Sequence, residues 1–195
     1  SGFDWLCIDL EHSVIDYFEV QQLITVISAN NCKPYVRIGA NDNLIIKRVL
    51  DAGAEGIIVP MVNTRHDAKK AVDAVKYPPM GKRGVGLSRA QGYGFEFDEY
   101  TKKVNSDILI VAQIEHIDAI NNLEEIINVD GIDGTIIGPY DLSGSIGKPG
   151  KYDDSDVKLL LKRYEETVRI HNKSLGYHII QPDHKLVIEK LNIRK

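Results

Sequence analysis

Four segments of the sequence end in polar side chains directly after an apolar run, and these side chains could carry acid–base or metal chemistry. They are Asp9-Leu-Glu-His12, Arg37 of Tyr-Val-Arg-Ile-Gly, Gln113-Ile-Glu115-His116 and Gly138-Pro-Tyr-Asp141. One such ending says little, because every strand has to end somewhere. Four of them would meet at one edge of a parallel sheet, and that favours a catalytic site over unrelated strand ends.

Glu115 and Asp141 could bind a divalent cation together. Two carboxylates that converge from neighbouring strand ends repel each other, and a bound Mg²⁺ or Mn²⁺ would relieve that repulsion with the hard oxygen ligands it prefers. Two protein ligands would leave positions for water and substrate. The alternative is a pair of solvated loop carboxylates, which these two residues alone do not exclude.

His12 and Arg37 have the chemistry of a general base and a fixed cation. His12 follows Asp9 and Glu11 at a strand end, which suits a base oriented by a carboxylate, although a lone histidine is more often structural. Arg37 could hold a carboxylate or stabilise an enolate. No lysine ends a predicted strand, which favours carbonyl activation by a metal over a Schiff base. His178 lies in a strand-like run and could belong to the core or to the rim.

Short apolar runs that alternate with amphipathic segments position these residues. The expected strands are residues 5–8, 34–38, 56–60, 108–114, 134–137 and 175–180, which are rich in Ile, Val and Tyr as buried parallel strands are. The expected helices are residues 18–27, 44–50, 68–75, 119–127 and 157–170. Asp42 or Asn43 could cap the second helix. This order predicts right-handed crossovers and a parallel sheet in a single α/β domain over residues 1–195.

An open doubly wound sheet and a (β/α)₈ TIM barrel both fit this order. The dinucleotide fingerprint is missing, because Gly84-Val-Gly86 is followed by Leu-Ser-Arg, and no Walker loop occurs. The barrel also predicts chemistry at the carboxyl ends of several strands, so we expect the barrel. Residues 77–94, with five glycines, two prolines and three cations, should form a long ordered loop that is functional or reaches a neighbouring subunit.

The composition excludes several classes of protein. The chain has 195 residues, 43% of them hydrophobic, and a formal net charge of −4, which suits one core and does not indicate a binder of nucleic acid or membrane surfaces. No apolar stretch reaches the ~18 residues of a membrane span, and the first residues lack a signal-peptide pattern. Cys7 and Cys32 are expected to be reduced thiols. We therefore expect a cytoplasmic protein.

Six motifs occur in the order of a known family. They are Ile8-Asp-Leu-Glu-His12, Val36-Arg-Ile-Gly39, Val59-Pro-Met-Val62, Tyr77-Pro-Pro-x-Gly-x-Arg-Gly84, Gln113-Ile-Glu115 and Ile137-Gly-Pro-x-Asp-Leu-Ser143. Over about residues 2–182 the sequence resembles the HpcH/HpaI aldolases, which are class II, metal-dependent pyruvate aldolases. The resemblance implies a TIM barrel that cleaves a 2-keto-3-deoxy sugar acid or a 4-hydroxy-2-oxo-dioate to pyruvate and an aldehyde, through a metal-bound pyruvate enolate.

The resemblance also implies ligands and partners. Glu115 and Asp141 would bind the divalent metal, Mg²⁺ or Mn²⁺ with Co²⁺ as a further candidate, and no organic cofactor is expected. Gln113 and the backbone around Gly138, Tyr140 and Asp141 would hold pyruvate. The protein would be a homo-oligomer, typically a hexamer, with sites near subunit contacts. The loop of residues 77–94 would contribute to the site rim or to that interface.

The remaining roles concern proton transfer. The resemblance makes His12 the base, and Asp51 the residue that pairs with it and raises its basicity. Arg37 would bind the keto oxygen and stabilise the enolate, and Asp9 would be a supporting acid. The role of Glu11 stays unassigned.

Two features depart from the family pattern. Tyr140 stands where the family usually has a small residue, and its ring could narrow the pocket or alter the range of aldehydes. A full barrel takes about 250 residues, whereas this sequence predicts six strands. We therefore expect the family's first strand with its helix, and its last strand, to be missing from the sequence.

Two other functions remain open. One is an acyl-CoA lyase of the citrate lyase β-subunit type, which shares the metal–carboxylate barrel. The other is a non-catalytic barrel that binds pyruvate-like metabolites. The intact set of Glu115, Asp141, Arg37 and His12 favours an enzyme over the binding barrel.

Overall fold

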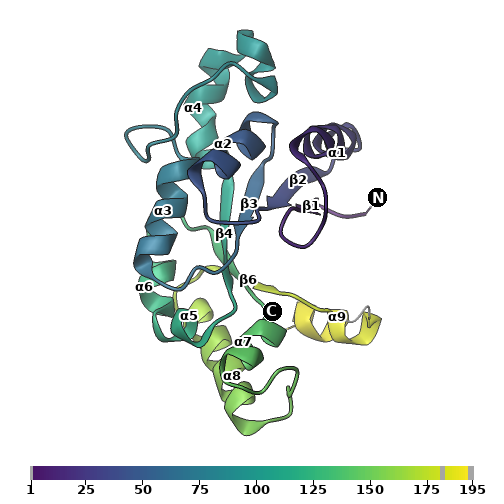
Figure 1. The fold of residues 1–195 in the computed structure, drawn as a ribbon, viewed down its shortest axis with the longest axis vertical. Helices are drawn as coiled ribbons and strands as arrows, with labels where there is room; N and C mark the ends of the chain where they lie inside the picture. Colours follow the sequence, from purple (N-terminus) through teal and green to yellow (C-terminus); the bar gives the residue numbers. More distant parts are fainter. Residues whose placement is uncertain (1, 181–182, 193–195) are drawn as a thin grey trace.

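A curled sheet of six parallel strands forms the centre of the structure, a computed structural model that describes residues 2–180 and 183–192. The strands are β1 (Trp5–Asp9), β2 (Lys33–Arg37), β3 (Gly56–Val59), β4 (Leu109–Ile114), β5 (Gly134–Ile137) and β6 (Ser174–Tyr177). They pair in the order in which they occur in the chain. This is the order of a barrel, whereas a doubly wound sheet reverses its order part-way. The described residues thus form a partial TIM-type barrel (Figure 1).

All six predicted strands are confirmed. The first five agree with the prediction to within one residue at each end, and β6 ends three residues earlier than expected. A closed eight-stranded barrel is not confirmed, because the described residues supply six strands. No helix in the described parts of the chain is long and apolar enough to cross a membrane. Cys7 and Cys32 are free thiols.

Helices surround the outside of the sheet. They are α1 (Tyr17–Ala29), α2 (Asn43–Asp51), α3 (Arg65–Val75), α4 (Phe97–Asp107), α5 (Ile117–Asn121), α6 (Leu123–Ile127), α7 (Pro139–Ser145), α8 (Ser155–Ile170) and α9 (His184–Asn192), with a 3₁₀ helix η1 (Arg89–Gly94). The Asp42 carboxylate accepts the backbone N–H groups of Leu44 and Ile45 at 2.8 and 3.1 Å, which confirms it as the N-cap of α2.

Three helices were not predicted, and the helix predicted over residues 119–127 is divided into α5 and α6. The α4 helix buries only Val104, so its sequence has little apolar periodicity. The α7 helix begins with Pro139, a residue that suits the first helical position but also reads as a loop after a strand. These helices therefore depend on tertiary packing more than on their own pattern.

The two faces of the sheet have different surroundings. One row of side chains, with Val36, Ile57 and Ile110 fully buried, packs into the core beneath the helices. Successive residues of a strand point to opposite faces, so the residues between them face the concave inner side. Near the amino-terminal strand ends this side is an open cavity of about 830 Å³, where Trp5 and Tyr35 stack with ring centroids 5.0 Å apart. Asp9 and Arg37 alternate in the same phase as Trp5 and Tyr35 and therefore face the same concave side.

The loop of residues 77–94 lies at the amino-terminal end of the sheet. The Arg83 side chain is completely buried; its Nη2 donates to Asp51 Oδ1 at 2.7 Å, and its guanidinium carbon lies 4.7 Å from the centroid of the Tyr77 ring. Arg89 Nη1 donates to the Ala52 carbonyl at 3.0 Å. Both anchors are at the end of α2, which runs back from the carboxyl end of β2 toward the start of β3. This chain therefore does not place the loop at the site rim, and a contact with a neighbouring subunit stays a prediction.

Arg83→Met is expected to lower the free energy of unfolding by about 3 kcal/mol, because it leaves the Asp51 carboxylate without its buried cation. Urea unfolding at pH 7 measures this. Lys82→Met is the matched control, since its side chain is 80% exposed in an ion pair with Asp73 and should cost less than about 1 kcal/mol. Equal losses for the two variants would contradict the anchoring role of Arg83.

Candidate active site

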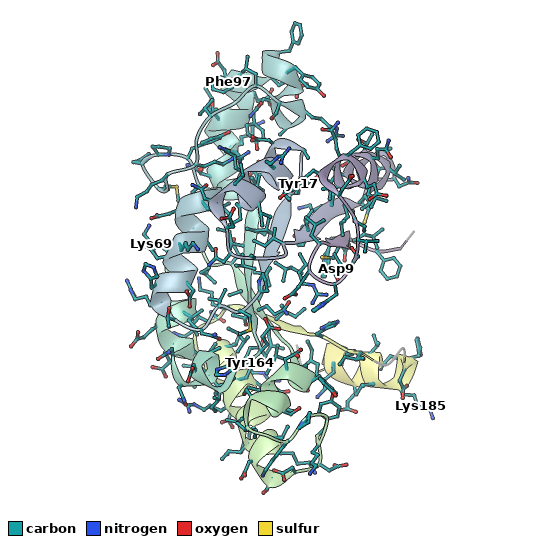
Figure 2. The ribbon with its side chains drawn as sticks, in the orientation of Figure 1. Asp9, Tyr17, Lys69, Phe97, Tyr164 and Lys185 are labelled. Atoms are coloured by element: carbon teal, nitrogen blue, oxygen red, sulfur yellow. The ribbon has the colours of Figure 1, made fainter. Side chains whose placement is uncertain are left out.

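The carboxyl ends of the strands bring most of the predicted site residues to one rim. Asp9 and Arg37 are the last residues of β1 and β2 and face each other in register. Glu115 directly follows β4, and Asp141 lies in the first turn of α7, immediately after β5. Figure 2 shows Asp9 on the side of the strands away from Lys69 of α3. The predicted clustering of strand ends is thus present.

Arg37 is held by two carboxylates. Its Nε and Nη2 donate to the two oxygens of Asp9 at 2.9 and 2.5 Å, and its Nη1 lies 3.3 Å from Glu11 Oε2. Burial alone would raise the pKa of Asp9, but the Arg37 hydrogen bonds hold that pKa below its ordinary value. The hydrogen bonds that Arg37 donates to Asp9 in turn raise the pKa of Arg37. Arg37 is therefore a permanent, oriented cation, and Asp9 supports it directly.

Glu11, whose role the sequence left open, is a third carboxylate of the rim. Its side chain is 16% exposed, and its Oε2 is buried without a hydrogen bond although it lies near Arg37. Burial and the negative charge of Glu115 raise the pKa of the Glu11 carboxyl. Glu11 thus interacts electrostatically with both Arg37 and Glu115.

His12 and Asp51 lie far apart in this chain. His12 is on the loop after β1, 70% exposed, with its Nε2 3.8 Å from Glu11 Oε2. Asp51 ends α2 and pairs with Arg83. Because α2 runs antiparallel to the strands, it carries Asp51 to the end of the sheet opposite His12. The predicted His12–Asp51 pair does not form within one chain, and the proton-transfer roles of both residues stay predictions.

Glu115 and Asp141 converge on Gly138. A Cβ atom added at Gly138 would lie 3.1 Å from Glu115 Cβ, 3.5 Å from Glu115 Oε2 and 3.8 Å from Asp141 Oδ2. Glycine therefore keeps open a space that both carboxylates border. Glu115 is 5% exposed and accepts hydrogen bonds from the Met61 N–H at 2.7 Å and from Gln113 Nε2 at 2.6 Å, so its position is fixed.

This pair of carboxylates fits a divalent cation. Hard oxygen donors beside a space that a Cβ would fill suit Mg²⁺ or Mn²⁺, and two protein ligands leave positions for substrate and water. No group of three or more His, Cys, Asp or Glu side chains arranged for a metal occurs within residues 2–180 and 183–192. Any cation here would accordingly depend on Glu115, Asp141 and the substrate.

Met61 helps to position Glu115, a role that the sequence did not predict. Its φ is +51°, in the left-handed region that side chains other than glycine seldom adopt. This conformation lets its backbone N–H reach Glu115. A backbone donor leaves no side-chain signature, so the only signal was the motif Val59-Pro-Met-Val62.

The predicted pyruvate-binding residues lie around the same space. Gln113 is 4% exposed and bonded to Glu115. The Tyr140 ring leans on the loop after α7, because a Cβ at Gly150 would lie 3.3 Å from its Cε2. The Tyr140 side chain is half exposed, and its effect on the aldehyde range stays a prediction.

His178 belongs to the rim, one of the two locations that the sequence allowed. Its backbone N–H donates to the Ile137 carbonyl at 3.0 Å, which extends the β5–β6 pairing by one residue. Burial and then Arg37 lower the pKa of His178, while Asp141, Asp9 and Glu115 act in the opposite direction. The imidazole therefore lies within electrostatic reach of the whole rim.

The comparison with protein families agrees with this geometry. A family model described as HpcH/HpaI aldolase/citrate lyase matches residues 1–185. The chain belongs to this family. The resemblance inferred from the six motifs is thereby confirmed. The description of the family indicates an aldolase or a lyase.

Individual similar proteins also match most of the chain. The 2-keto-3-deoxy-L-rhamnonate aldolase of Escherichia coli (strain K12) is 36% identical over 185 residues, which are 94% of this chain and 69% of the relative. A family member from Burkholderia cenocepacia J2315 superposes with a TM-score of 0.92 at 30% identity, over 98% of this chain and 76% of that one. Citrate synthase SbnG gives a TM-score of 0.84 at 29% identity, over 98% and 74%.

Glu11→Gln is expected to raise the free energy of unfolding at pH 7 in buffer with EDTA. A raised folded-state pKa means that the folded chain favours protonated Glu11, so the charged form costs stability as the pH rises from the ordinary value of about 4.3 through the raised pKa. The gain over the wild type should vanish in acid, grow through that window and then level off. Urea unfolding at a series of pH values measures it.

Glu125→Gln, at an exposed position of α6, is the control and should change stability little at any pH. A gain for Glu11→Gln that does not depend on pH would contradict the electrostatic explanation.

Proposed function

We propose that this chain carries the active site of a divalent-metal-dependent pyruvate aldolase, an aldehyde-lyase of the EC 4.1.2 type. The substrate would be a 2-keto-3-deoxy sugar acid or a 4-hydroxy-2-oxo-dioate, and the products pyruvate and an aldehyde. The convergence of Glu115 and Asp141 on Gly138, on the same rim as the oriented Arg37, carries the proposal. The 36% identity to an aldolase named for a 2-keto-3-deoxy sugar acid supports it.

Pyruvate would bind where the fixed polar groups meet. Arg37 is positioned by Asp9 to hold the keto oxygen and to stabilise the negative charge that develops on it. Gln113 and the backbone around Gly138, Tyr140 and Asp141 would orient the carboxylate. A cation held by Glu115 and Asp141, Mg²⁺, Mn²⁺ or Co²⁺, would supply Lewis-acid stabilisation of the enolate charge when bound. No organic cofactor is needed for this chemistry.

His12 would transfer the proton. In the cleavage direction it would take the proton from the C4 hydroxyl, the C3–C4 bond would break, and its electron pair would enter the enolate of pyruvate. Protonation of the methylene carbon then gives pyruvate. The His12 side chain is exposed and can therefore exchange protons with solvent. Its Nε2 lies 3.8 Å from Glu11 Oε2, which can also accept a proton.

The purified chain, with Mg²⁺ or Mn²⁺ and pyruvate in D₂O, is expected to exchange the methyl protons of pyruvate, which NMR detects directly. Glu115→Ala should abolish the exchange together with metal binding. His12→Ala should lower the exchange by about 10²-fold or more while metal binding, followed by titration calorimetry, is retained. A chain that binds metal and pyruvate yet never exchanges these protons would overturn the aldolase proposal.

Asp51 could orient His12 only from a second copy of the chain. The two residues lie at opposite ends of the sheet within one chain, whereas a subunit packed against the rim could offer its own Asp51, held in place by Arg83. We propose a homo-oligomer with the site at a subunit contact, and a hexamer as the resemblance to the HpcH/HpaI aldolases implies. A cytoplasmic location stays part of the proposal.

Mixed oligomers test this arrangement. His12→Ala and Asp51→Ala are each expected to be nearly inactive, and subunits exchanged in equal amounts should regain about a quarter of the wild-type sites, because half of the subunits supply each intact residue. Pyruvate release measures the recovery. Activity that stays at the level of the separate variants would overturn the site shared between subunits.

The alternative function is a lyase that cleaves an acyl-CoA. The likeness to citrate synthase SbnG and the words citrate lyase in the family description support this alternative. Cleavage of an acyl-CoA measured beside pyruvate release from a 2-keto-3-deoxy acid decides between the two. Binding of pyruvate without either reaction would leave the non-catalytic barrel.

A further inference from the structure

His178 is a polar side chain of the rim that has no role in the proposed reaction. We propose that it is a specificity-determining residue, whose imidazole hydrogen-bonds a hydroxyl group on the aldehyde half of the substrate. This inference rests on the proposed aldolase function and extends it to the choice of substrate.

The strand geometry directs His178 to the inner face. Tyr177, the residue before it, packs against the core beneath the helices, and Lys190 of α9 lies 4.4 Å from the centroid of its ring. Gly176 lines the inner cavity. Since side chains alternate along an extended chain, and the His178 N–H continues the pairing with β5, the His178 side chain points to the same face as Gly176.

Because the sheet is curled, His178, directly after β6, faces the carboxyl ends of β1 and β2. β6 is at one edge of the sheet and β1 at the other, yet Arg37 and Asp9 are close enough to influence the imidazole, as are Glu115 and Asp141. His178 is therefore across the mouth of the partial barrel from β1 and β2. A substrate bound at Glu115 and Asp141 would lie between these two sides.

The groups around this space can each be assigned to one part of the substrate. The pyruvate half is assigned to Arg37, Gln113 and the Glu115–Asp141 pair, and the reacting hydroxyl to His12. The other half must extend from them along the rim, and β6 adjoins β5, whose end carries Gly138 and Asp141. His178 is thus placed to meet the first atoms of the aldehyde beyond the reacting carbon.

Its chemistry favours a hydroxyl there. An imidazole can donate one hydrogen bond and accept another, as a hydroxyl group requires. A second substrate carboxylate would instead approach the carboxylates of Asp9, Glu115 and Asp141. The cation of this group, Arg37, is already paired with Asp9. The geometry points to a hydroxylated aldehyde, as a 2-keto-3-deoxy sugar acid releases, rather than to the aldehyde acid from a dioate.

Aldol addition of pyruvate to 2-hydroxypropanal and to propanal tests this, because the two acceptors differ by one hydroxyl. The wild type should prefer 2-hydroxypropanal in kcat/KM. His178→Leu should lower kcat/KM for 2-hydroxypropanal by about ten- to a hundredfold, the cost of leaving one hydroxyl unpaired, and should change that for propanal little. His178→Gln, which keeps a donor and an acceptor, should recover part of the preference.

Two controls separate the possible failures. Pyruvate methyl-proton exchange involves no aldehyde and should stay within about twofold of the wild type in both variants, while His171→Leu, at the C-cap of α8, should leave the preference unchanged. A wild type without exchange would refute the proposed function itself. A wild type that exchanges, with His178→Leu losing both acceptors equally or losing the exchange, would overturn the role of His178.

Discussion

Parallel pairing of six strands in chain order is the constraint on which the rest of the structure depends. It gives every strand the same direction, so Asp9, Arg37, Glu115 and Asp141 meet at one edge although they are far apart in the sequence. Because side chains alternate along each strand, the apolar row is buried under the helices while the polar ends remain on the inner side. A single change of strand direction would move one of these groups to the other end of the sheet.

The rim that results carries more negative than positive charge. Asp9, Glu11, Glu115 and Asp141 lie near one arginine, and the charges influence one another: Arg37 lowers the pKa of Asp9, whereas burial and Glu115 raise that of Glu11. Asp9 neutralises Arg37 and fixes its direction. Among residues 2–180 and 183–192, no arginine or lysine forms an ion pair with Glu115 or Asp141, and the space that Gly138 leaves beside them suits a cation. The same excess of carboxylates would favour neutral, hydroxylated groups in the remainder of the substrate.

The opposite end of the sheet serves a different purpose. There the buried Arg83 joins the loop of residues 77–94 to Asp51, and Arg89 joins it to the end of α2. Interactions at the amino-terminal end of a barrel usually contribute stability, and those at the carboxyl end chemistry. Asp51 is therefore in a stabilising cluster of its own chain, and a catalytic role for it requires a second chain that brings this end to a neighbour's rim.

The strands and their carboxyl ends could be predicted from the residues alone, because apolar runs rich in β-branched residues are a local property and polar residues mark their ends. The family could be predicted from six short motifs in order. The sequence did not determine α4 or α7, whose patterns are polar or begin with proline. Three contacts became visible only in the folded chain: Asp9 binds Arg37, the Met61 N–H holds Glu115, and the His178 N–H pairs with Ile137 at the carboxyl end of β5. The tertiary structure also separated Asp51 from His12. Each of these depends on the direction of a backbone or side chain in space, and residue types along the chain do not encode that direction until the sheet has curled.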